Sequence, residues 1–195
     1  MRRTLLLVLA FLLLAAPAAQ GQFKYTTANG SITITAYSGS ADAVTIPSTI
    51  NNLPVTSIGV SAFSGCISVA SVTIPDSVTR IESSAFVDCE SLTNLTIGNG
   101  VTSIGLSAFS GCTSLASVTI PNSVTGIGVF AFATCISLAS VTIPNSTTTI
   151  GTEAFAGCSS LTNVTLGNGV TSIGVSPFTG CQELTAITVN SSNPA

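Results

Sequence analysis

Histidine and tryptophan are absent from this sequence, and charged residues are scarce. The 195 residues include no His, no Trp, one Met and only 6% Asp, Glu, Lys and Arg together. Without His the chain lacks the side chain that most often acts as a general base near neutral pH, and a common zinc ligand. We therefore expect no catalytic residues, no metal site and no cofactor.

Positive charge is rarer than negative charge. Two of the four cations, Arg2 and Arg3, lie at the extreme N-terminus; without them Lys24 and Arg80 stand against seven acids, a net charge of −5. Such a balance disfavours binding to nucleic acid or to anionic membranes. The densest group of charges, at residues 80, 82, 88 and 90, is interpreted as a solvated corner, because exposed charges contribute little.

Long apolar runs are missing except at the N-terminus. Arg2 and Arg3 precede an apolar run at residues 5–16, and the small residues Ala19 and Gly21 suit cleavage before Gln22. The run is short for a bilayer span, although an uncleaved anchor is the alternative. The pattern predicts a signal peptide at residues 1–21. The mature chain is then secreted, extracellular or at the cell surface, without membrane insertion.

The rest of the chain repeats with a period of 23 residues. Ile keeps this period from Ile58 to Ile173 without a gap. Phe keeps the same period at Phe63, Phe86, Phe109, Phe132, Phe155 and Phe178. The cysteines follow it at Cys66, Cys89, Cys112, Cys135, Cys158 and Cys181. A fixed period of this length is typical of a solenoid.

A single unit has too little apolar surface to fold alone. About six large apolar side chains stabilise it by at most ~12 kcal/mol. Ordering the backbone of its 23 residues costs more, at ~1 to 2 kcal/mol per residue. Stacking covers the open faces and pairs the strands in a parallel ladder. We expect each unit to contain a strand, a turn, a short extended piece and a helical or 3₁₀ corner. Six such units occupy residues 56–195, after an N-terminal cap at residues 22–55.

The apolar pattern of the units is similar to a known family. Units such as Leu115-x-x-Val118-x-Ile120-Pro121-x-x-Val124-x-x-Ile127-Gly128-x-x-Ala131-Phe132-x-x-Cys135 resemble the BspA-like leucine-rich repeats, over residues 44–189. The resemblance implies a right-handed solenoid with a parallel concave sheet, and extracellular adhesion or protein binding. The chain departs from the pattern at corner positions: Gly98 and Gly167 replace Pro, Pro177 replaces Ala, and Glu82 replaces Gly.

The cysteine column allows two readings. An exported chain with six cysteines is compatible with disulfides. Equivalent side chains of stacked coils, however, project in parallel about 4.8 Å apart, which exceeds the ~3.5–4.5 Å between Cβ atoms of a disulfide. We therefore favour buried free thiols that form part of the core with the Phe column. Disulfides between adjacent coils remain the alternative.

Threonine forms the main outward column. It lies between inward residues of each predicted strand, at Thr73, Thr96, Thr119, Thr142, Thr165 and Thr188. A second column, from Thr56 to Thr171, recurs past the turn. The plain interpretation is strand propensity and solubility; the functional one is a hydroxyl and methyl lattice that binds a flat, repetitive target. The composition disfavours a tight interface, because the chain has no Trp and few Arg to act as anchors.

The sequence thus predicts a non-catalytic interaction or adhesion module that binds an extracellular protein or glycan through the Thr column. A structural spacer and an ice or glycan-surface binder are the alternatives. The last predicted strand, Leu184 to Val189, is followed by six residues without an evident cap. An open strand edge of this kind favours end-to-end self-association or a labile last coil.

Overall fold

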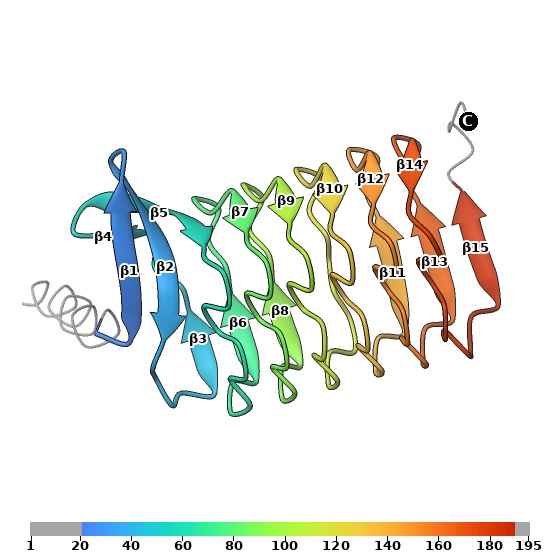
Figure 1. The fold of residues 1–195 in the computed structure, drawn as a ribbon, viewed down its shortest axis with the longest axis horizontal. Coiled ribbons are helices and arrows are strands. Elements are labelled where there is room, and N and C mark those ends of the chain that lie inside the picture. Colours follow the sequence, from blue (N-terminus) through green and yellow to red (C-terminus); the bar gives the residue numbers. More distant parts are fainter. Residues whose placement is uncertain (1–20, 190–195) are drawn as a thin grey trace, which may run out of the picture.

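The computed structural model describes residues 21–189, which form a solenoid of stacked coils (Figure 1). The coils follow one another from an N-terminal hairpin to the last strand, β15 (Ala186–Val189). The predicted repeat solenoid is confirmed. Residues 1–20, nearly all of the predicted signal peptide, lie outside the described residues. Between residues 21 and 189 no helix is long and apolar enough to cross a bilayer.

One face of the solenoid is built from the Val-Thr-Ile segments, and we call it the Thr face. In these strands alternate residues point inward: Val141 and Ile143 are buried while Thr142 is exposed, as expected for a half-buried strand of β-branched residues. The strands pair in parallel with their equivalents in neighbouring coils, residue for residue, within each of two sheets. The strands are β3 (Ala43–Thr45), β6 (Ser71–Thr73), β8 (Asn94–Thr96), β11 (Ser140–Ile143), β13 (Asn163–Leu166) and β15.

The Thr face is interrupted at one coil. The segment 117–120 forms only an isolated parallel bridge, between Ser117 and Ser140. The face therefore consists of two three-stranded sheets, β3-β6-β8 and β11-β13-β15.

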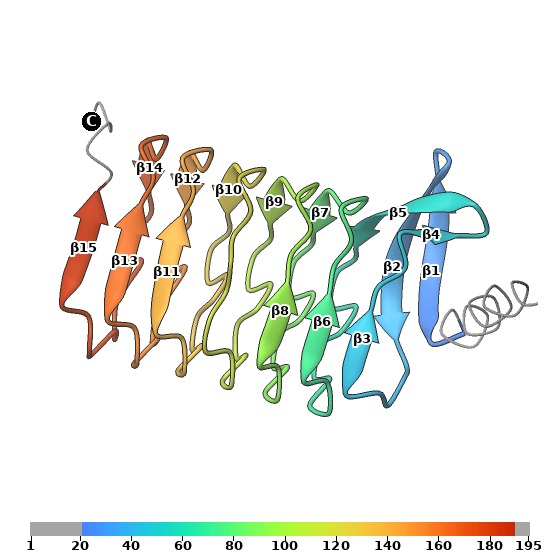
Figure 2. The same ribbon diagram turned by 180° about the vertical axis from the view of Figure 1, so that it is seen from behind.

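A second face is made of shorter strands, and we call it the short-strand face. Its strands also pair in parallel, Ile127 with Ile104 on one side and with Ile150 on the other. Figure 2 shows the two faces from behind, in the same order along the stack. The strands of this face are β5 (Leu53–Ile58), β7 (Arg80–Ile81), β9 (Ser103–Ile104), β10 (Gly126–Ile127), β12 (Thr149–Ile150) and β14 (Ser172–Ile173).

The N-terminal end is closed by an antiparallel hairpin, β1 (Phe23–Ala28) and β2 (Ser31–Tyr37). Strand β2 pairs in parallel with β5, so the hairpin continues the short-strand face. A short strand, β4 (Thr49–Ile50), folds back antiparallel on β5. The hairpin covers the first coil with an aromatic contact, because the ring centroids of Tyr37 and Phe63 lie 5.1 Å apart.

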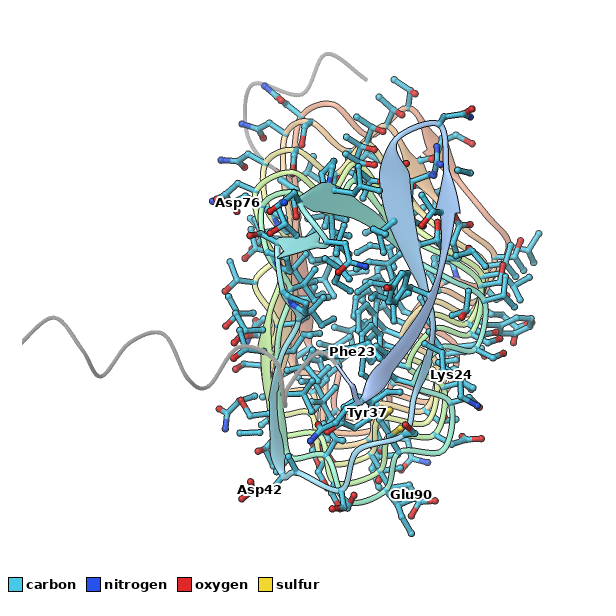
Figure 3. All side chains as sticks on the ribbon, turned by 90° about the vertical axis from the view of Figure 1, so that its left-hand side faces the viewer. Phe23, Lys24, Tyr37, Asp42, Asp76 and Glu90 are labelled. Atoms are coloured by element: carbon cyan, nitrogen blue, oxygen red, sulfur yellow. The ribbon has the colours of Figure 1, made fainter. Side chains whose placement is uncertain are left out.

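The core lies between the two faces (Figure 3). The Phe column runs through it as a continuous stack, with centroids 5.2 Å apart between Phe109 and Phe132 and 5.3 Å between Phe132 and Phe155. Phe23 and Tyr37 extend the stack at the N-terminal end. At the other end Phe178 is half-buried. The few charged side chains lie outside this core, as Figure 3 shows for Lys24, Asp42, Asp76 and Glu90.

The corners are turns, so the predicted helical or 3₁₀ corners are a point on which the sequence interpretation was wrong. No helix occurs within residues 21–189. Hydrogen bonds of the turn type do occur, such as Ser110 N to Ser107 O and Leu115 N to Cys112 O. They do not extend into a helix because each corner contains two residues with positive φ, and a left-handed residue ends a right-handed helix.

These left-handed residues form two columns of their own. The first consists of Ser61, Ser84, Ser107, Phe130, Glu153 and Ser176. The second consists of Gly65, Asp88, Gly111, Thr134, Gly157 and Gly180. Only the second has a sequence signal, since Gly adopts this conformation without steric cost.

Thr134 is a β-branched residue at a position that four other coils fill with Gly. Its φ is 56°. A left-handed conformation costs a non-glycine residue about 1–2 kcal/mol, while Gly costs about 0.5–1 kcal/mol in chain entropy. We expect Thr134→Gly to raise the free energy of unfolding by about 0.5–1 kcal/mol. Urea melts should show this gain, and Gly157→Thr, the reverse change in the next coil, should show a loss. A loss with Thr134→Gly contradicts the strain at this position.

The last coil is less protected than the others. Ile173, Ile187 and Val189 are exposed, although their equivalents in earlier coils are buried. Pro177 is tolerated in this coil because its carbonyl still accepts the Phe155 N–H at 2.9 Å. The end-to-end self-association expected from this open end stays a prediction.

Candidate interaction surface

The Thr column lies on the outer side of the Thr face. Thr142 pairs with Thr165 and Thr165 with Thr188, so these side chains stand at equivalent positions on neighbouring strands. Thr73 and Thr165 are half-buried and the other four are exposed. Parallel strands place such side chains about 4.8 Å apart along the stack.

The two Thr columns differ in what their hydroxyl groups do. In the second column every hydroxyl after that of Thr56 donates to the backbone carbonyl of the preceding coil, as Thr125 Oγ1 does to Thr102 O at 3.1 Å. The same bond is made by Thr79, Thr102, Thr148 and Thr171. Within residues 21–189 no hydroxyl of the first column makes a hydrogen bond to the protein. The first column therefore has donors and acceptors available for a ligand, whereas the second stabilises the stack.

The Thr face carries no charge at its outward positions. Polar uncharged groups and methyl groups alternate there instead. The outward residues are Ala43, Thr45, Ser71, Thr73, Asn94, Thr96, Ser117, Thr119, Ser140, Thr142, Asn163, Thr165, Ala186 and Thr188. A flat, neutral surface of this composition can bind through many weak hydrogen bonds and methyl contacts, but it lacks a deep anchor pocket.

The cysteines form a column of free thiols beside the Phe stack. Each Sγ from Cys89 to Cys181 donates to the carbonyl of the Phe in the preceding coil, for example Cys135 to Phe109 O at 3.2 Å. Burial raises the pKa of the Cys89 and Cys158 thiols to about 12, and raises that of Cys135 well above its ordinary value. Because the thiolate is the reactive form, these groups are poor nucleophiles and poor metal ligands near neutral pH.

The charged group at residues 80–90 is dispersed. Arg80 Nε and Glu82 Oε1 are 3.3 Å apart, and Ser57 Oγ donates to Glu82 at 3.2 Å. The Glu82 carboxylate, at a corner position that is Gly in other coils, thus interacts with both Arg80 and Ser57. Within residues 21–189 no three potential metal ligands come together.

One set of surface residues escaped the sequence analysis. Phe130 lies on the outer corner of the central coils, at a position that is Ser or Glu in the other coils, and Leu106, Val129 and Ile136 lie on the same corners. The signal in the sequence is Phe130 itself, the one apolar residue of its column, which lies outside the periodic Phe column.

Comparison with known proteins identifies the repeat. The model of the BspA type leucine-rich repeat region matches residues 31–159 and 79–194, with six copies. None of the curated protein sequences matches the chain.

Solved bacterial leucine-rich repeat structures are similar over most of the chain. The Treponema pallidum leucine-rich repeat protein is 37% identical, with a TM-score of 0.85, over 87% of this chain and 80% of that one. A leucine-rich repeat protein from Bacteroides ovatus is 35% identical with a TM-score of 0.75, over 85% of this chain and 45% of its own length.

A leucine rich cell surface protein from Faecalibacterium prausnitzii is 34% identical with a TM-score of 0.63, over 88% of this chain and 54% of its own length. The chain therefore spans most of the first of these relatives and about half of the other two. With the family model covering most of its residues, the chain belongs to the BspA type leucine-rich repeat family.

Proposed function

We propose that this protein is a secreted or cell-surface interaction module, without catalytic activity, that binds an extracellular protein or glycan through the Thr face. The single observation that carries the proposal is the difference between the two Thr columns. One column uses its hydroxyls within the stack, and the other leaves them unbonded on a flat, uncharged face.

The chemistry of the Thr face favours a neutral, extended target. A repeated array of weak contacts binds by avidity, because each further coil that engages the target does so at high effective concentration. A charged ligand finds no complementary charge on this face. Family membership supports a protein-interaction role, and the cell-surface relative from F. prausnitzii supports an extracellular location.

Binding can be tested on arrays of neutral glycans and of extracellular matrix proteins. We expect the mature chain to bind at least one of these probes, and we expect Thr119→Lys/Thr142→Lys to lose that binding because two charges enter the neutral face. The control is Ser91→Lys/Ser160→Lys, which adds the same charge on exposed turns. Absence of binding to both arrays, or equal loss with both double variants, points to the spacer instead.

A second candidate is binding to ice or to another crystalline surface. It rests on the register of Thr142, Thr165 and Thr188, which gives a regular row of free hydroxyls. Thermal hysteresis that falls in Thr119→Lys/Thr142→Lys supports this candidate. No hysteresis at high protein concentration eliminates it.

A further inference from the structure

The central coils carry an aromatic residue, Phe130, at a corner position where no other coil has an apolar residue. The corner patch consists of Phe130 together with Leu106, Val129 and Ile136, whose columns are apolar in some other coils as well, as at Val60 and Ile67. The position of Phe130 is filled in the other coils by Ser61, Ser84, Ser107, Glu153 and Ser176. In a chain whose units are near-copies, one aromatic residue in a corner column that is otherwise Ser or Glu marks that corner as different in role.

The patch is contiguous because hydrogen bonds hold its segments in adjacent coils. Ser107 N donates to Val129 O at 2.9 Å, which places the corner that carries Leu106 beside the corner that carries Val129 and Phe130. Within the corner itself, Ala133 N donates to Phe130 O at 3.0 Å. Leu106 is 47% exposed, Ile136 is 45% exposed, and Phe130 is half-buried.

Phe130 is an unusual residue for its backbone. Its φ is 55°, and a bulky side chain in the left-handed region is a steric outlier. Among residues 38–189 it is also the one aromatic that does not belong to the stacked column. Stability alone does not explain it, because Ser occupies the same position and the same backbone conformation in four other coils. An observed outlier of this kind is a reason to look for function.

Carboxylates border the corner patch. Glu153 occupies the position of Phe130 in the next coil, and Asp88 and Glu90 occupy the positions of Thr134 and Ile136 two coils earlier. Figure 3 shows Glu90 at the outer edge of the molecule. The two cations of the described chain are accounted for elsewhere: Arg80 pairs with Glu82, and Lys24 lies in β1 of the cap. The surroundings of the patch are therefore acidic.

We infer that the corner patch docks a basic, amphipathic segment of a partner protein. An apolar side chain of the segment packs on Phe130 and Leu106, and flanking Lys or Arg residues face Glu153 on one side and Asp88 and Glu90 on the other. Aromatic anchors of this type dominate binding energy at interfaces, and the charges select the partner. This surface is separate from the Thr face and does not depend on it.

The test uses a synthetic amphipathic helical peptide of Leu and Lys, with a peptide in which Glu replaces each Lys as its control. We expect the Leu/Lys peptide to bind the mature chain and the Leu/Glu peptide not to bind it. High salt should weaken the binding of the Leu/Lys peptide. Phe130→Ser should weaken it by about tenfold or more. It should keep the melting temperature of the parent, because Ser is the residue of the other coils.

Further variants test whether the peptide binds at the corner patch, to the negative charge of the protein as a whole, or to the Thr face. We expect Leu106→Ser to weaken binding of the Leu/Lys peptide, Glu153→Gln to weaken it less, and Thr119→Lys/Thr142→Lys to leave it unchanged. The inference is overturned if the parent does not bind the Leu/Lys peptide, if it binds both peptides equally, or if Phe130→Ser binds as tightly as the parent.

Discussion

Phe132→Ala is expected to lower the free energy of unfolding by about 3–5 kcal/mol. Phe132 is fully buried and stacks on Phe109 and Phe155, with centroid distances of 5.2 and 5.3 Å. Truncation removes both ring contacts and leaves a cavity in the middle of the stack, which rigid backbone ladders on either side cannot close. Equilibrium urea melts measure the change.

The same truncation at the end of the stack should cost less. Phe178 is half-buried and stacks on one ring, Phe155, at 5.7 Å. In a one-dimensional stack the cost depends on how many neighbours a coil has. Phe130→Ala is the matched control, because this half-buried ring lies outside the column. Equal costs for Phe132→Ala and Phe178→Ala contradict the one-dimensional account.

Alkaline pH is expected to unfold the protein through its buried thiols. The pKa of Cys89 and Cys158 is raised to about 12 by burial, and burial also raises the pKa of Cys112 and Cys135 well above the ordinary value. In the unfolded chain these thiols lose their protons near pH 8.5. Above that pH the folded state binds more protons than the unfolded state, so stability falls as pH rises. Below about pH 8.5 the thiols are protonated in both states, so their burial does not lower the stability.

The size of the effect follows from the number of thiols. Each thiol that stays protonated only in the folded state lowers the free energy of unfolding by about 1.4 kcal/mol per pH unit. Four thiols give a slope of up to ~5 kcal/mol per pH unit, which is a large share of the stability of an ordinary domain. Urea melts between about pH 7.5 and 10.5, in the presence of a reductant, measure the slope.

Cys135→Ala provides the control for this slope. The substitution removes one buried thiol, so we expect the slope to fall by the contribution of one proton, whatever its effect on stability near neutral pH. A slope that stays the same in Cys135→Ala, or a parent whose stability does not change above pH 9, shows that the thiols are not the cause.

The sequence predicts the inward half of this fold well. The 23-residue period assigns Phe, Cys and Ile to inward columns because burial selects residue type strongly, and a solenoid repeats its burial at every coil. The outward half is harder. The hydroxyl of Thr125 bonds to the preceding coil and that of Thr119 does not, yet both are threonines of equal periodicity. Thr125 N also donates to Thr102 O, at 2.9 Å, so the backbone already holds this hydroxyl beside its acceptor, and the period does not encode that contact.

Backbone conformation at the corners is not predictable from local sequence either. Ser107, Phe130 and Glu153 share a positive φ without sharing any preference for it; the coils above and below impose it through hydrogen bonds such as Phe130 N to Thr152 O. Strand pairing behaves in the same way. The tetrapeptide Ser-Val-Thr-Ile occurs at residues 117–120 and again at 140–143, and only the second pairs as a full strand. We find no local cause for that difference.

The central claim is that one Thr column serves binding and the other serves the stack, and isosteric substitutions test it most directly. Thr119→Val/Thr142→Val removes hydroxyls from the first column, and Thr125→Val/Thr148→Val removes them from the second. Each pair should be measured for binding to the array probe and for stability in urea.

We expect the first pair to lose binding with unchanged stability. The second pair should keep binding and lose about 0.5–1.5 kcal/mol for each hydrogen bond removed. If both double variants change stability equally, or if Thr125→Val/Thr148→Val alone loses binding, the claim that one column binds and the other stabilises the stack is wrong.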